Sequence, residues 1–447
     1  MSSKPSATVN RAAFPPVRRR ELWAWAMYDF ANSGYTTVVI TAVFGAYFVS
    51  SVAGNAAWGT FAWTAGLAVS YLLIMLTGPA LGAYADLHAA KKKLLAVTTA
   101  GCVVFTAALA LAGPGAVWVA LPLIVLSNYF FGSGENLIAA FLPELAKGRD
   151  LGKVSGWGWS LGYLGGLLSL GCALAYITWA QSRGLGAAHF VPVTMLITAA
   201  LFALSSLPTF LLLRERAVPQ PGQHTHPFRN TFARLGHTLT HLRQYRDLAR
   251  FFLCIVFYQA GVQAVIALAA IYAQQAMHFQ IQDTLKLILV VNVTAAIGAF
   301  LFGYVQDRIG HIPTLALTLA GWIAMVLIAA TAQGPGAFWF AANLAGLCMG
   351  SSQSAGRALV GYLSPRARCA EFFGLWGFAV KLSAILGPVT YGVASWVTDS
   401  DHRLAMLLTG SYFIAGLVIL FSVNVRRGRR AALRANRDES DSPANFS

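Results

Sequence analysis

Long runs of apolar residues, separated by short polar connections, make up most of the 447-residue sequence. A helix that crosses a membrane needs about 20 mostly apolar residues, and twelve runs reach that length. They lie near residues 23–51, 58–84, 94–113, 116–141, 152–180, 189–213, 250–276, 284–305, 312–332, 336–361, 371–397 and 404–425. The pattern predicts an all-α integral membrane protein with twelve transmembrane helices.

Basic residues are concentrated on alternate connections. The tails and the connections after even-numbered runs hold most of them, namely Arg18–Arg20, Lys91–Lys93, Lys147, Arg149, Lys153, the segment 214–246, Arg308, Arg366, Arg368 and Arg426–Arg430. The other connections hold chiefly Arg183, Lys286 and Arg403. Because short cytoplasmic connections are enriched in Lys and Arg, we expect both termini in the cytoplasm and a multi-pass protein of a bacterial inner (plasma) membrane.

The composition narrows the possible partners. Hydrophobic residues make up 57% of the chain, charged residues make up 11%, and the mean hydropathy is +0.60. A net charge of +16 suits nucleic acid only where the cations gather on a soluble patch, so we expect no nucleic-acid partner. The five cysteines are scattered and have no CxxC spacing, which argues against a disulfide framework or a zinc site. We expect no metal or cofactor, and without a G-x-x-x-x-G-K-S/T loop we expect no ATP-driven transport.

A short motif occurs after the second run and again after the eighth. The first copy, GAYADLHAAKKKLL, begins at Gly82, and the second copy, GYVQDRIGHIP, begins at Gly303. Each copy contains G-x-x-x-D, ending at Asp86 or Asp307, and the copies are about half a chain apart. Internal duplication on this scale is typical of transporters, and it predicts two pseudo-symmetric six-helix halves.

The repeat sets the expected domain boundaries. They are a cytoplasmic N-tail at 1–21, a six-helix half at 22–213, a cytoplasmic central loop at 214–248, a second six-helix half at 249–425 and a cytoplasmic C-tail at 426–447. In the central loop, Phe228, Phe232, Leu235, Leu239 and Leu242 recur at helical spacing, which predicts an amphipathic helix on the membrane surface. His237 and His241 lie one turn apart, but without acidic or thiol neighbours they favour a solvated basic face over a metal site.

The duplicated motif resembles the signature loop of the major facilitator superfamily, G-x-x-x-D-R/K-x-G-x-R/K-R/K. Glycine lets two helices approach closely, and an aspartate can sit at the N-terminus of a neighbouring helix. The resemblance implies that Gly82, Asp86, Gly303, Asp307 and Arg308 act in conformational gating. The first copy departs from the consensus at Leu87 and Ala89, and the second lacks the final basic pair.

Other stretches resemble one branch of that superfamily, the vacuole effluxers. They are WAMYDFANSGYTTVV (25–39), AAFLPELA (139–146), SGWGWSLGYLGG (155–166), GSSQSAGRAL (350–359) and EFFGLWGFAVKLSAILGP (371–388). The similarity runs from about residue 22 to 425. Fungal members of the branch are described as exporting amino acids from the vacuole. The resemblance therefore implies a secondary transporter and suggests amino acids as cargo.

Four ionisable residues lie inside the apolar runs: Asp29, Glu135, Arg357 and Lys381. A charge at the bilayer centre costs about 3 kcal/mol on insertion scales, so such residues normally face the bundle interior or a watery cavity. In the resembled fold, the acids belong to the N-terminal half and the bases to the C-terminal half. Two interpretations stay open. In one, the four form salt bridges, with each other or with neighbours such as Glu371, that close the cytoplasmic side. In the other, they bind the ammonium and carboxylate groups of a zwitterion.

Amide side chains accompany these charges, at Asn32, Asn136, Gln259, Gln263 and Gln353. Gln259 and Gln263 are four residues apart and therefore share one helix face. An amide in a membrane helix often only bridges two helices. Their concentration on spans that line the cavity of the resembled fold predicts a polar binding chamber instead.

The sequence predicts a secondary active transporter that exports a small polar or zwitterionic solute, an amino acid or a related metabolite, by rocking of the two halves. A carboxyl such as Asp29 or Glu135 can couple transport to protons, and facilitated diffusion stays open. The alternative cargo is a larger amphiphile, such as a drug, lipid or peptidoglycan fragment. Because no nucleophile clusters with a base, we do not expect an enzyme. We expect a monomer surrounded by membrane lipids.

Overall fold

A computed structural model describes residues 16–217, 242–275, 281–397 and 402–441. Within these residues every regular element is helical, so the predicted all-α fold is confirmed. The amphipathic helix predicted in the central loop lies outside the described residues except at Leu242, and so do His237 and His241.

The first half runs from α1 to α8. Its elements are α1 (Arg19–Tyr35), the π-helical η1 (Thr36–Ala42), α2 (Phe44–Tyr47), the π-helical η2 (Phe48–Val52), α3 (Gly59–His88), α4 (Lys91–Ala108), η3 (Leu109–Leu111), α5 (Val117–Ala139), α6 (Leu142–Leu145), η4 (Gly148–Asp150), α7 (Leu151–Ser182) and α8 (Ala187–Leu212). The elements α1 to η2 form one span, Arg19–Val52. The π-helical turns shift the register of its side chains along the way.

The second half follows the central loop. Its elements are η5 (Leu242–Tyr245), α10 (Arg246–Gln275), α11 (Ile281–Ile309), α12 (His311–Thr331), α13 (Pro335–Leu363), η6 (Arg366–Arg368), α14 (Cys369–Val397), α15 (His402–Phe421) and α16 (Val425–Asp441). Across the described chain, eleven helical segments are long and apolar enough to cross a membrane. The remaining predicted run, 336–361, forms α13, which is long enough but carries the polar stretch Ser351–Ser354 and Arg357. The arrangement is consistent with twelve spans.

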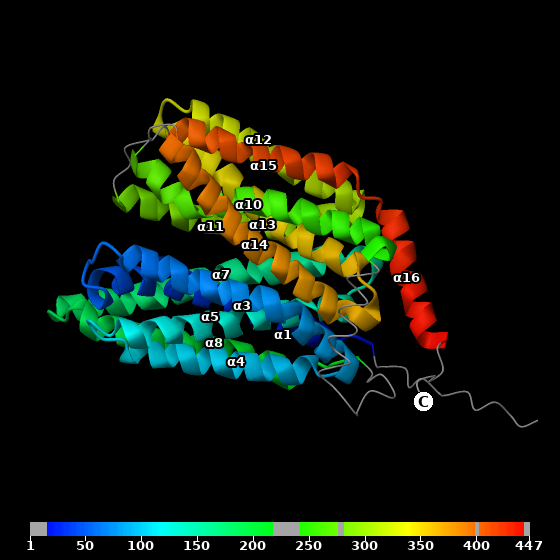
Figure 1. The fold of residues 1–447 in the computed structure, drawn as a ribbon, viewed down its shortest axis with the longest axis horizontal. Helices are drawn as coiled ribbons and strands as arrows, with labels where there is room; N and C mark the ends of the chain where they lie inside the picture. Colours follow the sequence, from blue (N-terminus) through cyan, green and yellow to red (C-terminus); the bar gives the residue numbers. More distant parts are fainter. Residues whose placement is uncertain (1–15, 218–241, 276–280, 398–401, 442–447) are drawn as a thin grey trace, which may run out of the picture.

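The two halves lie side by side as separate bundles (Figure 1). Helix α3 of the first half packs on α14 of the second, and α7 packs on α11 and α13. Small residues permit these close crossings, because lipid supplies little hydrophobic drive between helices. A Cβ atom on Gly374 of α14 would lie 2.5 Å from the carbonyl oxygen of Gly78 on α3, and one on Gly303 of α11 would lie 2.8 Å from that of Gly152 on α7.

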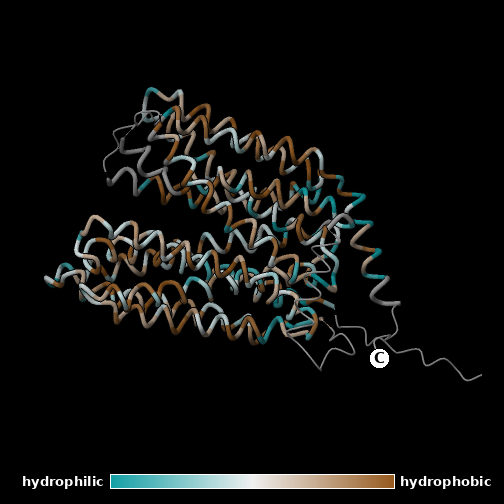
Figure 2. Tube along the Cα trace, in the orientation of Figure 1, coloured by the Kyte–Doolittle hydropathy of each residue, from teal (hydrophilic) through white to brown (hydrophobic). Residues whose placement is uncertain are grey.

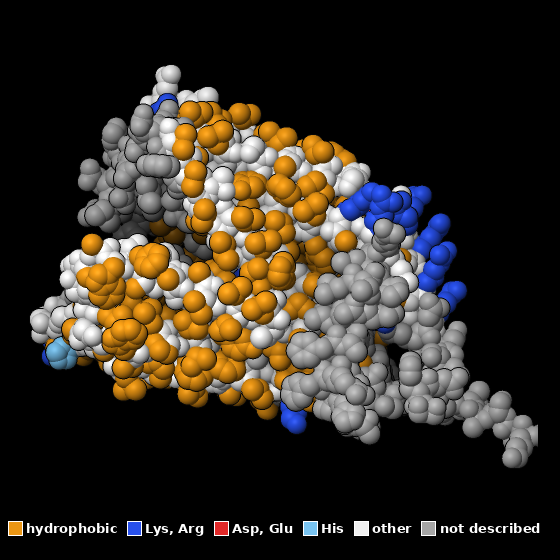
Figure 3. All heavy atoms as spheres, viewed as in Figure 1, with side chains coloured by type: hydrophobic (Ala, Val, Ile, Leu, Met, Phe, Trp, Pro, Cys, Tyr) orange, Lys and Arg blue, Asp and Glu red, His pale blue; other side chains and the backbone are white. Residues whose placement is uncertain are grey.

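Polar residues gather at one end of the bundle (Figure 2). This end, here named the basic end, carries the start of α1, Lys91–Lys93, Arg366–Arg368 and α16, and it is the end predicted to be cytoplasmic. Exposed apolar side chains cover the flank between the two ends (Figure 3), as lipid contact requires. Toward the end opposite α16, the helices of the two halves diverge (Figure 1).

Candidate functional site

An ion pair between Asp29 and Arg357 joins the two halves. The Arg357 Nη1 atom on α13 lies 2.7 Å from Asp29 Oδ2 on α1. Ser155 on α7 accepts two further hydrogen bonds from the guanidinium, 3.1 Å from Nε to Oγ and 3.0 Å from Nη2 to the backbone oxygen. The Trp25 and Trp159 rings lie 4.7 and 5.3 Å from the guanidinium carbon. Only 3% of the Arg357 side chain is exposed, so this pair is almost fully enclosed.

Glycine makes room for this pair. A Cβ atom on Gly158 of α7 would lie 2.6 Å from Arg357 Nη2 and 2.8 Å from the Trp25 ring. One turn further along, a Cβ on Gly162 would lie 2.9 Å from Ser33 Oγ on α1. These contacts allow α7 to pack tightly on α1, and at Gly158 any larger side chain would displace the ion pair.

A second ion pair between the halves is formed by Glu135 on α5 and Lys381 on α14. The Lys381 Nζ atom lies 3.2 Å from Glu135 Oε2. It also lies 5.6 Å from the centre of the Tyr71 ring and 5.8 Å from that of Phe131. The Glu135 side chain is 24% exposed, whereas that of Asp29 is 11% exposed. The Glu135–Lys381 pair is therefore the more accessible of the two.

All four intramembrane charges thus meet as two acid–base pairs, each with its acid in the first half and its base in the second. Both interpretations can use these two pairs, in which the acids contact Arg357 and Lys381, while the backbone nitrogen of Glu371 contacts Asp86. Sequence reasoning missed the residues that enclose the pairs, namely Trp25, Tyr71, Phe131, Ser155 and Trp159. Ser155 and Trp159 belong to the SGWGWSLGYLGG stretch, where small residues alternate with tryptophan.

The predicted amides are distributed around the pairs. Asn136 follows Glu135 on α5 and packs against Gly377 of α14, and neither polar atom of its buried side chain has a hydrogen-bond partner. Asn32 Oδ1 and Gln259 Oε1 are also buried without a partner. Gln353 accepts a 3.4 Å hydrogen bond from Tyr163 across the halves. Gln263 is half-buried, and within the described residues neither it nor Gln259 contacts either ion pair.

Asp86 of the first motif copy contacts the second half. Its Oδ2 atom accepts a 2.9 Å hydrogen bond from the backbone nitrogen of Glu371, in the first turn of α14. Its Oδ1 atom lies 3.2 Å from Lys91 Nζ, and Lys91 also pairs with Glu144 at 2.8 Å. A Cβ atom on Gly82 would clash with the backbone of Ala370.

Asp307 of the second copy makes the corresponding contact from the second half to the first. Its carboxylate accepts hydrogen bonds from the backbone nitrogens of Gly152 (2.9 Å) and Lys153 (3.0 Å), in the first turn of α7. An acceptor at a helix N-terminus satisfies free N–H groups and interacts favourably with the helix dipole. Arg308 is exposed and takes no part in these contacts.

A polar cluster, missed from sequence, extends the contacts of the first copy. Glu215, just after α8, accepts hydrogen bonds from the backbone nitrogens of Lys91 (2.7 Å) and Lys92 (3.0 Å). Burial raises the pKa of the Glu215 carboxyl, and these two hydrogen bonds oppose that rise. Arg216 pairs with Glu21 of α1 at 2.8 Å. The cluster fixes the start of the central loop to the first half.

Sequence comparison places the chain among transporters. A family model described as "Vacuole effluxer Atg22 like" matches residues 149–433. The MFS-type transporter YxiO of Bacillus subtilis is 29% identical over 403 residues, or 89% of this chain and 93% of that protein. Autophagy-related protein 22-1 of Aspergillus fumigatus is 25% identical over 345 residues, or 68% of this chain and 54% of the fungal protein.

Solved structures establish the fold. The proton:xylose symporter XylE aligns with a TM-score of 0.73 at 16% identity, covering 93% of this chain and 98% of the symporter. The human organic anion transporter MFSD10 aligns with a TM-score of 0.69 at 12% identity, covering 91% of this chain and 100% of the human protein. The chain therefore belongs to the vacuole effluxer Atg22-like family, and it is a multi-pass membrane transporter of the major facilitator superfamily, not an enzyme.

Proposed function

We propose that this transporter exports a small zwitterionic solute, an amino acid or a related metabolite, by alternating access. The observation that carries the proposal is the Glu135–Lys381 pair, in which an accessible acid of one half faces a base of the other at 3.2 Å. An amino acid presents an ammonium group and a carboxylate, so it can replace each partner of this pair by a charge-assisted hydrogen bond. The exchange leaves the site electrically balanced, which limits the cost of desolvated charge.

Polar and aromatic neighbours suit such a ligand. The unpaired polar atoms of Asn136 lie one residue beyond Glu135, and amides can orient a polar ligand. Tyr71 and Phe131 beside Lys381 supply aromatic surface for a side chain. The substrate site thus spans both halves, as rocking about a midplane site requires.

The more enclosed Asp29–Arg357 pair acts in this proposal as a gate. Together with the Asp86 and Asp307 contacts, it joins the halves toward the basic end, while the helices of the two halves diverge toward the opposite end (Figure 1). With the predicted orientation, this conformation is closed to the cytoplasm. Export then requires a second conformation in which these contacts are broken and solute enters from the cytoplasm. Asp29 and Glu135 are the candidates for proton coupling. In this conformation they contact Arg357 and Lys381, and in the conformation open to the cytoplasm each would release its base and bind a proton.

Transport by purified full-length protein in proteoliposomes tests the proposal. Radiolabelled neutral amino acids would be compared with lipophilic cations, with and without a pH gradient, for the wild type and for Glu135→Gln and Lys381→Gln. Asp150→Asn and Lys147→Gln are matched controls, because they remove the same charges from exposed connections. A thermal-shift screen of the same ligands reports binding independently, since a ligand of the folded state raises its melting temperature.

Loss of one charge-assisted hydrogen bond is expected to weaken amino-acid binding by roughly tenfold or more, in both site variants and in neither control. Transport of lipophilic compounds alone, unaffected by Glu135→Gln and Lys381→Gln, would replace the proposal by the amphiphile alternative. If amino-acid flux does not depend on the pH gradient, proton coupling is ruled out and facilitated diffusion is the mechanism that fits.

A further inference from the structure

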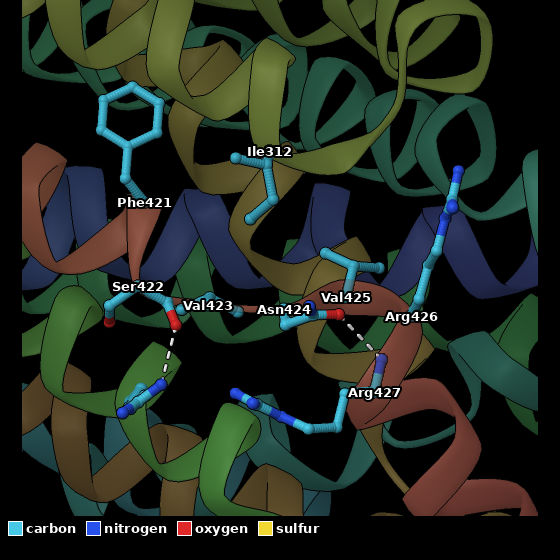
Figure 4. A pocket seen from close by; sticks show the side chains of 9 residues that line it. Ile312, Phe421, Ser422, Val423, Asn424, Val425, Arg426 and Arg427 are labelled. Carbon is cyan, nitrogen blue, oxygen red and sulfur yellow. Dashed lines mark hydrogen bonds between the residues drawn. The ribbon is translucent and has the colours of Figure 1, made fainter.

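A basic pocket of about 470 Å³ lies where the last span ends and α16 begins (Figure 4). Arg250 of α10, Ile312 of α12 and the segment Phe421–Arg427 line it. Figure 4 shows Phe421 and Ile312 on one side of the turn 422–425 and the Arg427 side chain on the other. The Arg426 side chain lies on the same side of the turn as Phe421 and Ile312 (Figure 4), so apolar and cationic groups adjoin there, whereas Arg427 on the other side is paired with Asp247.

The turn that forms the pocket is fixed by hydrogen bonds. Arg250 Nη1 donates to the backbone oxygen of Ser422 at 2.9 Å. Arg427 makes two 2.7 Å hydrogen bonds to the Asp247 carboxylate, and its backbone nitrogen donates to Asn424 Oδ1 at 2.9 Å. These bonds tie the start of α16 to α10. The pocket is thus part of the folded second half, not a feature of a loose tail.

A second pocket of about 480 Å³ continues along α16. It shares Arg426 and Arg427 with the first pocket and adds Gln244, Arg430 and Arg434. Neither pocket has an Asp or Glu among its lining residues. The two pockets form one cationic surface, here named the arginine strip, along which negative charge is attracted.

The sequence of α16 explains why the arginine strip faces outward. Gly428 and Ala432 are buried, so small residues pack the helix against the second half. Arg426, Arg430 and Arg434 are exposed on the other face, and a row of basic side chains appears along this edge of the molecule (Figure 3). Within the described part of the chain, these three arginines have no ion-pair partner.

The position of the arginine strip identifies its ligand. The last span ends at Phe421, whose side chain is 67% exposed, and Arg426 follows five residues later. Apolar surface that adjoins cationic surface at the end of a span matches a phospholipid at the membrane interface. We propose that the arginine strip binds an anionic phospholipid, whose phosphate contacts Arg426 and Arg430 and whose acyl chains lie along Phe421 and Ile312.

A free phosphate ion would use the arginines but not Phe421 and Ile312, so the continuity of the arginine strip with the lipid-facing surface favours lipid. The lipid site lies on the flank of the second half, remote from the Glu135–Lys381 pair. Binding at the arginine strip is therefore expected without any transported solute. The proposal stands independently of the cargo.

Native mass spectrometry of the full-length protein in neutral detergent tests this site. The protein would be titrated with phosphatidylglycerol, with phosphatidylcholine as the neutral lipid and inorganic phosphate as the free anion. Arg426→Gln combined with Arg430→Gln removes two charges from the arginine strip. Arg19→Gln combined with Arg20→Gln is the matched control, because it removes two exposed charges from the basic end of the first half. Thermal unfolding confirms that both double variants remain folded.

Each arginine near an anionic lipid surface contributes about fivefold in affinity, so the strip variant is expected to bind phosphatidylglycerol about 25-fold more weakly. The control should bind it like the wild type, and phosphatidylcholine should bind weakly to all three proteins. Equal weakening in the control would show a general charge effect and overturn the site. If inorganic phosphate saturates the arginine strip and blocks phosphatidylglycerol binding, the strip is a site for free anions and not for lipid. Unchanged phosphatidylglycerol binding in the strip variant would also refute the proposal.

Discussion

Removing the charge of Arg357 tests whether its pair with Asp29 keeps the halves together at the basic end. In Arg357→Gln, Asp29 loses the 2.7 Å hydrogen bond from the guanidinium. Asp29 itself stays buried, with only 8% of the whole residue exposed. Breaking a buried ion pair by removing one partner costs about 3–5 kcal/mol, because the other charge is left uncompensated. The contact joins the two halves, so the cost falls on the conformation that is closed at the basic end.

A cost of about 3 kcal/mol changes a population ratio by about 150-fold. Arg357→Gln and Asp29→Asn should therefore each shift the protein toward the conformation that is open at the basic end. The double variant removes both charges and leaves no buried ion, so it should be less perturbed than the sum of the single variants. We expect a coupling energy of about 1–3 kcal/mol between the two positions.

Double electron–electron resonance between spin labels at Lys93→Cys and Arg366→Cys measures the equilibrium between the closed and open conformations. Both positions are exposed at the basic end, and they belong to different halves. Cys172 is half-buried and would be replaced by serine in the labelled background. Lys147→Gln is the control, since Lys147 is exposed and lies outside the ion pairs and motif contacts described above. If Arg357→Gln leaves the distance distribution unchanged, or if the two single variants are additive, the pair does not hold the gate and the reasoning fails.

Three further variants probe the motif contacts. Gly82→Val should prevent closure at the basic end, because its Cβ would overlap the backbone of Ala370; the same label pair should report a longer distance, whereas Gly171→Ala, with open space around it, should leave the distance unchanged. Asp307→Asn weakens the acceptor for two backbone N–H groups and should destabilise the closed conformation by about 1 kcal/mol, seen as a small fall in melting temperature. Asp86→Asn should cost more, about 2 kcal/mol, because it also removes one of the two carboxylates beside the buried Lys91, which keeps Glu144; equal effects of the two asparagine variants would contradict this ranking.

Much of the architecture was predictable because hydrocarbon imposes strict rules on sequence. Each span needs a long apolar run, and charges inside a run must face the protein interior. Those rules predicted that Asp29, Glu135, Arg357 and Lys381 face the interior, and the resemblance to the superfamily fold assigned the acids to one half and the bases to the other. Helix α13 is less apolar than a span is expected to be. Its Ser351–Ser354 stretch can be polar because it packs on neighbouring helices and does not face lipid.

Which acid meets which base was not predictable. Asp29 and Arg357 are 328 residues apart in sequence, and their pairing depends on how α1, α7 and α13 are staggered after packing. A small residue at Gly158 suits close helix packing, but the space that it leaves for the Arg357 guanidinium depends on three helices that meet there. The helix formed by the segment after the last span, α16, was also not predicted, for another reason. The small residues Gly428, Ala432 and Ala435 recur at helical spacing, but the segment was predicted only as a cytoplasmic C-tail.

The duplicated motif explains why closure at the basic end depends on both halves. Asp86, from the first half, accepts a hydrogen bond at the start of α14, and Asp307, from the second half, accepts two at the start of α7. Each contact satisfies N–H groups at a helix terminus that would otherwise need water. Rocking cannot separate the halves at this end without exposing both termini together. We therefore propose that the two copies act as one gate, and that the enclosed Asp29–Arg357 pair adds a third contact between the halves that must break in the same step.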